Sequence, residues 1–169
     1  ANHDASDELT ALAETGMLPV MSAYRRLDVI ANSHPCYAGH LEINRFDDQL
    51  AAIEACDLVI AIGSRLDGIT SADDTMLSFG KPLIHIYPDR CVLDRFNSDV
   101  TINADMKPAL KALKAKILQP DSTRQTRTEF LHNSFMKFSQ PGNFNVYGEV
   151  DLSLVIKTID QFVDLDTTI

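Results

Sequence analysis

The sequence predicts an α/β fold built on a layered parallel sheet. Leu58–Ile62 is apolar at every position, which is typical of a parallel strand that is covered on both faces. Leu83–Ile86 repeats this pattern, and Val100–Ala104 is a weaker third copy. Segments with helical spacing of apolar residues lie between the strands, so strand and helix alternate through the first 118 residues. Such alternation indicates a parallel sheet with right-handed crossovers.

Apolar spacing also predicts the remaining elements. In the amino-terminal half we expect a helix over residues 5–14 and a short strand over 18–22. A long connection over 24–45 and a second helix over 46–56 should follow. Ser6 is the expected N-cap of the first helix, and Gly16 is placed to end it. Beyond the third strand we expect a helix over residues 106–118 and a polar linker over 119–127. A short helix over 130–138 and a final helix over 152–163 should follow.

Composition narrows the class of protein. Lys and Arg total 15 and Asp and Glu total 24, giving a net charge of −9 that disfavours a nucleic-acid partner. No apolar run approaches the roughly 18 residues of a membrane helix, so we expect no membrane partner. The 3 cysteines fit no Cys-x-x-Cys spacing, which predicts neither a disulfide framework nor a zinc site and favours the cytoplasm. Acidic and nucleophilic residues are scattered, so we expect no metal site and no catalytic residue.

Ligands of open α/β sheets bind beyond the carboxyl ends of the strands. Gly63, Ser64 and Arg65 follow the first buried strand. A glycine there lets the backbone approach a ligand, and Arg65 could pair with a phosphate or be the surface arginine of an ordinary turn. The segment is neither a Gly-Lys-Ser/Thr phosphate loop nor a Gly-x-Gly-x-x-Gly fingerprint.

The next two strand ends carry further polar candidates. His85 alternates with Ile86 and is either a hydrogen-bonded core residue or part of a site. Asp89 stands where a dinucleotide fold would place a ribose-binding carboxylate. Asp105 follows the third strand and could be a ligand or the N-cap of the following helix.

Five segments, in order along the chain, resemble the central domain of thiamine diphosphate-dependent enzymes of the acetolactate synthase type. They are Gly16–Val20, His34–Gly39, Ala55–Arg65, Ile84–Asp89 and Thr101–Asp105. The resemblance implies a three-layer Rossmann-like fold of the DHS-like NAD/FAD-binding class whose first strand is lacking here. It also implies a central domain over residues 1–118, a linker with a short helix over 119–150, and the start of a diphosphate-binding domain over 151–169.

The missing strand leaves two expectations for the sheet. Either Leu18–Ser22 pairs directly with Leu58–Ile62, or another chain fills the gap between them.

The same resemblance implies what the parent enzyme does. It would decarboxylate a 2-oxo acid such as pyruvate and pass the carbanion to an acceptor, with thiamine diphosphate as electron sink. The activating glutamate and the Gly-Asp-Gly motif that holds Mg²⁺ would lie in other domains of the parent chain, so we expect these residues alone to be inactive. The implied partners are those other domains and further copies in a dimer or tetramer.

Relatives that keep a nucleotide hold FAD or ADP at the strand ends. When these positions of the relatives are matched to this sequence, and His85 from the second strand is added, a set of candidate cofactor-binding residues results. They are Gly63, Ser64, Arg65, His85, Asp89 and Asp105. The second arginine typical of FAD-binding acetolactate synthases is missing after Arg65, which disfavours FAD. Two alternatives stay open: a stand-alone module for FAD, ADP or NAD of the sirtuin or transhydrogenase kind, and an oligomerisation scaffold.

Overall fold

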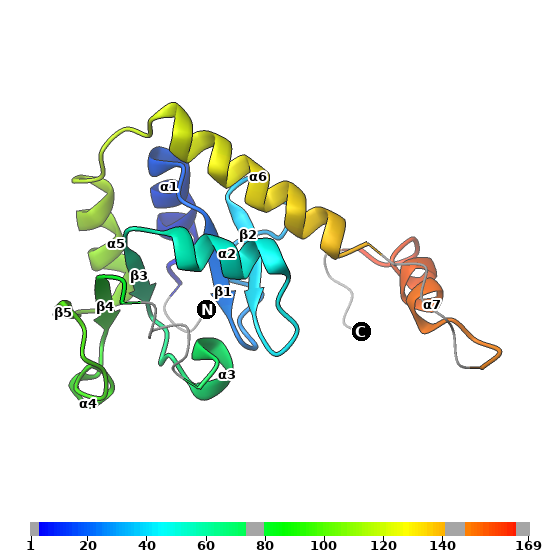
Figure 1. Ribbon diagram of the computed structural model, residues 1–169, viewed down its shortest axis with the longest axis horizontal. Coiled ribbons are helices and arrows are strands. Elements are labelled where there is room, and N and C mark those ends of the chain that lie inside the picture. Colours follow the sequence, from blue (N-terminus) through cyan, green and yellow to red (C-terminus); the bar gives the residue numbers. More distant parts are fainter. Residues whose placement is uncertain (1–3, 74–79, 141–147, 165–169) are drawn as a thin grey trace. The chain divides into compact units, whose positions relative to one another are not determined.

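The computed structural model describes residues 4–73, 80–140 and 148–164 (Figure 1). It divides into two compact units, Ala1–Phe135 and Met136–Ile169, and each is described by itself. In chain order the elements are α1 (Ser6–Gly16), β1 (Val20–Ala23), β2 (Tyr37–Leu41), α2 (Asp47–Ala55), β3 (Val59–Ile62), α3 (Gly68–Ser71), β4 (Leu83–Tyr87), α4 (Arg90–Leu93), β5 (Val100–Asn103), α5 (Met106–Lys114), α6 (Ser122–Phe138) and α7 (Leu152–Ile159). All strand pairs are parallel, and the predicted α/β fold is confirmed.

The three strands predicted from their apolar runs form one sheet in the order β3-β4-β5. Ile60 pairs with Ile84, and Ile84 pairs with Val100. One face of this sheet is covered by α1 and α5, whose Leu12 and Leu110 are buried in the same apolar cluster as Ile86. The opposite face buries a smaller cluster of Ala61, Leu66 and Leu83. The sheet is therefore covered on both faces, as the uninterrupted apolar runs require.

The second sheet contains a strand that the periodicity does not reveal. Residues 24–45 were expected to be a connection, but Tyr37–Leu41 forms β2 and pairs with β1. Val20 pairs with Tyr37 and Ser22 pairs with His40, so β2 carries a bulge. Gly39 lies within it at a φ of 88°. Because the extra residue interrupts the alternation of side chains, the strand shows no clear period of two.

The outer edge of β2 is closed by a glutamine. Gln49 of α2 is fully buried, and its Nε2 donates to the carbonyl oxygens of Ala38 and His40, each at 3.2 Å. On α6, a ring nitrogen of His132 lies 2.9 Å from the carbonyl oxygen of Tyr37. The α2 and α6 helices thus satisfy backbone groups that a further strand would otherwise take.

The two sheets stay separate, as Figure 1 shows. The expected pairing of Leu18–Ser22 with Leu58–Ile62 is wrong, since β1 pairs with β2 and β3 pairs with β4. Within the described ranges no sheet joins them, and the alternative, a further chain in the gap, stays a prediction.

The N-cap of α1 differs from expectation, whereas Gly16 is its last residue, as expected. Ala5, rather than Ser6, occupies the N-cap position, and it makes no side-chain cap. At the other end Met17 takes the left-handed conformation, at a φ of 45°. Gly16 is required for space instead: a Cβ there would lie 2.9 Å from Cγ1 of Ile117.

The second unit contains α7. Asp151 caps it, accepting hydrogen bonds from the hydroxyl of Ser153 at 2.5 Å and from the backbone nitrogen of Ser153 at 2.9 Å. The hydroxyl bond first, and the backbone bonds after it, lower the pKa of the Asp151 carboxyl. None of the helix residues is buried within the described structure, although Leu152 and Ile156 are apolar. Among the residues that the structure describes, no helix is long and apolar enough to cross a membrane.

Replacing Phe135 tests the packing of α6 on β2. Phe135 is 6% exposed and meets the Tyr37 ring edge-on at 5.0 Å, so Phe135→Ala should lower the free energy of unfolding by about 3–5 kcal/mol. Phe130 on the same helix is 54% exposed, and Phe130→Ala should cost about 1 kcal/mol or less. Urea unfolding of both variants measures the difference, and equal losses would contradict this packing.

Replacing Gly39 tests the bulge in β2. A Cβ there would lie 3.0 Å from Cδ2 of Phe135 and 3.1 Å from Cε1 of Phe46, at a φ unfavourable for side chains. Gly39→Ala should therefore cost at least about 2 kcal/mol of stability. Gly80 also has a positive φ but nothing within 4 Å of its Cβ position, so Gly80→Ala should cost only about 1 kcal/mol. A thermal unfolding midpoint that falls equally in both variants would rule out the steric contribution.

Candidate functional site

The carboxyl ends of β3, β4 and β5 bring several predicted residues together. The Arg65 Nε donates to the hydroxyl of Tyr87 at 3.0 Å. This hydrogen bond, with a further contribution from the negative charge of Asp89, raises the pKa of the Arg65 guanidinium. Arg65 and Asp89 are both exposed. We call this end of the strands the carboxyl edge, and it presents the fixed positive charge of Arg65 to solvent.

Gly63 is needed where the chain leaves β3. Its φ is 63°, and a Cβ would lie 3.1 Å from Sδ of Met106, the first residue of α5. Met106 is itself buried. A glycine therefore lets the loop turn directly over the start of α5, which keeps the backbone of Gly63 exposed.

Ser64 and His85 hold the loop that carries Arg65. Ser64 Oγ accepts a hydrogen bond from the nitrogen of Leu66 at 3.1 Å. The Ser64 carbonyl oxygen lies 2.9 Å from Nε2 of His85. His85 is fully buried, packs edge-on against Phe96, and has an Nδ1 for which the described structure offers no hydrogen-bond partner. In this structure His85 positions the loop from inside the core and presents no atom to solvent.

The two predicted carboxylates both cap helices. Asp89 Oδ1 accepts from the nitrogen of Cys91 at 2.9 Å at the start of α4. Asp105 Oδ1 accepts from the nitrogen of Met106 at 2.8 Å at the start of α5. Of the two interpretations of Asp105, the N-cap is the one that this geometry supports. Both carboxylates lie at the carboxyl edge, Asp89 after β4 and Asp105 after β5.

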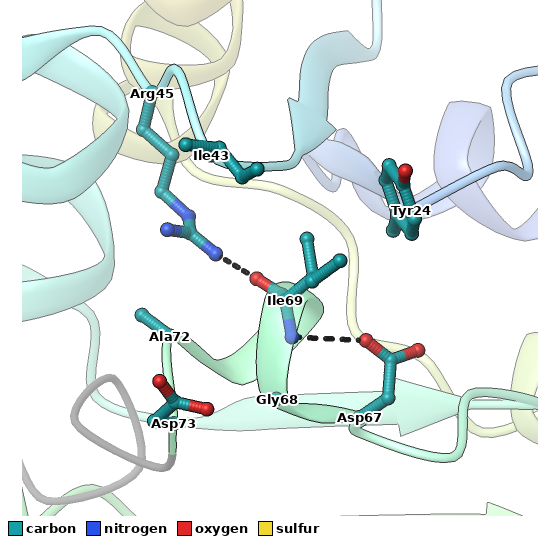
Figure 2. A pocket seen from close by; sticks show the side chains of 8 residues that line it. All are labelled: Tyr24, Ile43, Arg45, Asp67, Gly68, Ile69, Ala72 and Asp73. Atoms are coloured by element: carbon teal, nitrogen blue, oxygen red, sulfur yellow. Dashed lines mark hydrogen bonds between the residues drawn. The ribbon is translucent and has the colours of Figure 1, made fainter.

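A cavity of about 540 Å³ opens beside these loops (Figure 2). Its lining comes from the segments that follow β1, β2 and β3, and consists of Tyr24, Ile43, Arg45, Asp67, Gly68, Ile69, Ala72 and Asp73. Ile43 and Arg45 were not among the predicted site residues, because β2, which they follow, was not predicted. Had that strand been recognised, the carboxyl-end rule would have pointed to Ile43 and Arg45 directly.

Figure 2 shows how the wall of the cavity is held. Arg45 Nη2 donates to the carbonyl oxygen of Ile69 and, at 3.4 Å, to that of Thr70. Asp67 Oδ1 accepts from the nitrogens of Ile69 and Thr70 at 3.1 and 3.0 Å, which caps α3. Arg45 Nε is buried and lacks a hydrogen-bond partner in the described structure. The arginine therefore ties the loop after β2 to the loop after β3.

This edge combines a cavity, an exposed arginine side chain and exposed backbone of the loop after β3. A cavity of this size, flanked by an arginine and exposed backbone, suits part of a nucleotide-sized ligand. Within residues 4–73, 80–140 and 148–164, no three His, Cys, Asp or Glu side chains are grouped so as to hold a metal ion.

Comparison with known proteins places the chain. The family described as "Thiamine pyrophosphate enzyme, central domain" matches residues 1–113. The acetolactate synthase large subunit of Corynebacterium glutamicum is 28% identical over 127 residues, covering 75% of this chain and 20% of that protein. The probable acetolactate synthase large subunit of Methanocaldococcus jannaschii is 28% identical over 115 residues, covering 68% and 20%. The chain spans about a fifth of the length of these relatives. It belongs to the thiamine pyrophosphate enzyme central-domain family.

Proposed function

We propose that the chain is the central domain of a longer acetolactate synthase-like enzyme, which decarboxylates a 2-oxo acid such as pyruvate and joins the product to an acceptor. The observation that carries this proposal is the family match over residues 1–113, together with relatives that are named acetolactate synthase large subunits. Family membership supports a parent enzyme, and the reaction assigned to it is an inference from those names.

Thiamine diphosphate and Mg²⁺ do not fit the residues present here. The described residues contain no group of acidic or imidazole side chains suited to a cation, and the sequence contains no Gly-Asp-Gly. When bound elsewhere in the parent, the cofactor would supply an electron sink for the carbanion. The contribution of this chain would be to support and orient the domains that hold the cofactor.

The layout of the parent follows from the same proposal. Residues 119–150 would link the central domain to a diphosphate-binding domain that begins near residue 151. The exposed apolar side chains of α7 support this, because Leu152 is 74% exposed and Ile156 60% exposed, as expected for a helix whose covering domain lies outside these residues. The parent would work in the cytoplasm as a dimer or tetramer. The cysteines Cys36, Cys56 and Cys91 are free thiols, which are typical of the reducing cytoplasm.

A nucleotide, ADP or FAD, is our proposed ligand of the carboxyl edge. Gly63 and Ser64 would bring backbone close to its diphosphate, and Arg65 would pair with the phosphate charge. Asp89 and Asp105 would lie near its sugar, whereas His85 would act only by positioning Ser64. The exposure of Arg65 and its orientation by Tyr87 support this assignment. The alternatives are a stand-alone module that prefers NAD and a scaffold that binds no nucleotide.

An activity assay tests whether catalysis needs the domains of the parent enzyme that lie outside this chain. The full-length protein, supplied with thiamine diphosphate and Mg²⁺, should release CO2 from pyruvate, because all cofactor-binding domains are then present. The 169-residue chain alone should release none under the same conditions. A coupled assay for CO2 measures both, and turnover by the chain alone would overturn the proposed division of labour.

Calorimetric titration with ADP, FAD and NAD tests the nucleotide site. Arg65→Gln removes the charge that would meet the phosphates, and should raise the Kd for ADP about tenfold, the equivalent of one charge-assisted hydrogen bond. Arg127→Gln is the matched control, since Arg127 is an exposed arginine on α6. It lies away from the carboxyl edge, because its neighbour Thr128 donates a hydrogen bond to the carbonyl oxygen of Met17, just ahead of β1. Heat from none of the three nucleotides would favour the scaffold, and preference for NAD would favour the stand-alone module.

A further inference from the structure

Arg65 lies within residues 64–71, which we call the Arg65 segment. At its start the nitrogen of Leu66 donates to Ser64 Oγ at 3.1 Å. Leu66 is buried and takes the left-handed conformation, at a φ of 48°. The next residue, Asp67, caps α3. Local bonds and burial thus fix the chain from Arg65 to α3, so a movement of α3 would also move Arg65.

The sheet β3-β4-β5 holds the first part of the Arg65 segment. The carbonyl oxygen of Ser64 lies 2.9 Å from Nε2 of His85, which is buried in β4. The side chain of Leu66 packs in the apolar cluster with Ala61 of β3 and Leu83 of β4. Both contacts lie ahead of α3, so they fix only one end of the segment.

The other end of the segment is held by the loops that follow β1 and β2. The nitrogen of Tyr24 donates to Oγ1 of Thr70 at 3.3 Å. Arg45 Nη2 donates to the carbonyl oxygens of Ile69 and, at 3.4 Å, of Thr70. Figure 2 shows the Arg45 guanidinium bonded to Ile69 from one side and the Asp67 carboxylate bonded to it from the other. The first sheet therefore holds α3, although β1 and β3 do not pair within the described residues.

The position of these bonds makes Arg45 an effective anchor. Thr70 is 2% exposed and Ser71 is 1% exposed, so water has little access to the end of α3. Carbonyl groups in the last turn of a helix lack i+4 partners within the helix. An arginine suits such a place, because its planar guanidinium carries several donors and can serve two carbonyl oxygens at once.

We propose that Arg45 is a positioning residue of the carboxyl edge: it holds α3, and through α3 it holds Arg65 where Arg65 meets the phosphates of a nucleotide. The inference rests on the proposed nucleotide ligand, and it adds a residue from the other sheet that acts without touching that ligand. The affinity of a site carried by β3-β4-β5 then depends on the sheet β1-β2. Without Arg45 the segment is held mainly at one end, and binding has to order it at a cost in affinity.

Hydrogen exchange followed by NMR tests the anchoring without any ligand. In the structure the nitrogens of Thr70 and Ser71 donate to Asp67 at 3.0 and 2.8 Å. In Arg45→Ala these two amides should exchange at least about tenfold faster than in the unaltered 169-residue chain, because α3 opens more often. The amide of Val59, which is bonded within the sheet, is the internal reference and should keep its rate.

Arg26→Ala is the matched control for this experiment. It removes the same charge from the loop after β1, where Arg26 pairs with Asp28 at 3.5 Å and its side chain is 38% exposed. The amides of Thr70 and Ser71 should exchange at the unaltered rate in this variant. Faster exchange in Arg26→Ala as well would show that loss of charge alone loosens α3, and would overturn the role of Arg45.

Calorimetric titration with ADP measures the effect on binding. Arg45→Ala should raise the Kd toward the tenfold limit expected for Arg65→Gln, and Arg45→Lys, which keeps the charge and a donor, should recover part of the loss. The decisive measurement is the double variant. If Arg45 acts through Arg65, adding Arg45→Ala to Arg65→Gln should raise the Kd no more than about twofold further. A residue that only stabilises the fold, or that contacts ADP itself, would add its full loss.

Additive losses in the double variant would overturn the proposal, and so would unchanged exchange at Thr70 and Ser71 in Arg45→Ala. If the unaltered chain binds no nucleotide, the proposed ligand fails, and the exchange experiment alone decides whether Arg45 holds the Arg65 segment. Should Arg45→Ala fail to fold, Arg45→Met takes its place in both experiments, because methionine keeps most of the aliphatic length and has no donor. The same results then decide.

Discussion

The packing of α1 beside α5, on one face of β3-β4-β5, is the contact on which the rest of the first unit depends. Leu12 from α1 and Leu110 from α5 are buried against Ile86, which brings together segments some hundred residues apart in the chain. This contact fixes where α1 ends, and hence where β1 begins and which way it runs. The loops after β1, β2 and β3 line one cavity, and Arg45 joins two of these loops by its bonds to the Ile69 and Thr70 carbonyl oxygens.

The sequence was most informative where a strand is covered on both faces. β3 and β4 were predictable because cover on both faces leaves a largely apolar run. β5 was the weaker prediction, since it reads Val-Thr-Ile-Asn and three of its four residues are exposed. β2 was missed because its bulge at Gly39 breaks the alternation of side chains. The hydrogen bonds from Gln49 to its outer edge could not be predicted either, because they form only when α2 packs beside the strand. The one-turn helices α3 and α4 are too short to show a helical period. The cavity residues after β2 were lost with that strand.

The candidate site shows a second reason why sequence reasoning stops short. An aspartate after a strand can bind a ligand or cap the next helix, and both uses need the same residue at the same place. Asp89 and Asp105 were therefore ambiguous until their bonds to Cys91 and Met106 were known. His85 was equally open, because alternation gives its face of the strand but not what covers that face. Only the tertiary arrangement shows that Phe96 and the Ser64 loop enclose it.

The Gln49 side chain has a consequence for the time during which the protein is being made. A nascent chain emerges from the ribosome from its amino end, so β2 and α2 leave the ribosome before β3 to β5 do. At that stage unpaired backbone groups along β2 could pair with strands of other nascent chains and start cross-β aggregation. Because α2 follows β2 by only a few residues, the glutamine that covers the Ala38 and His40 carbonyl oxygens is synthesised soon after them, and it needs no residue from the later strands to reach them.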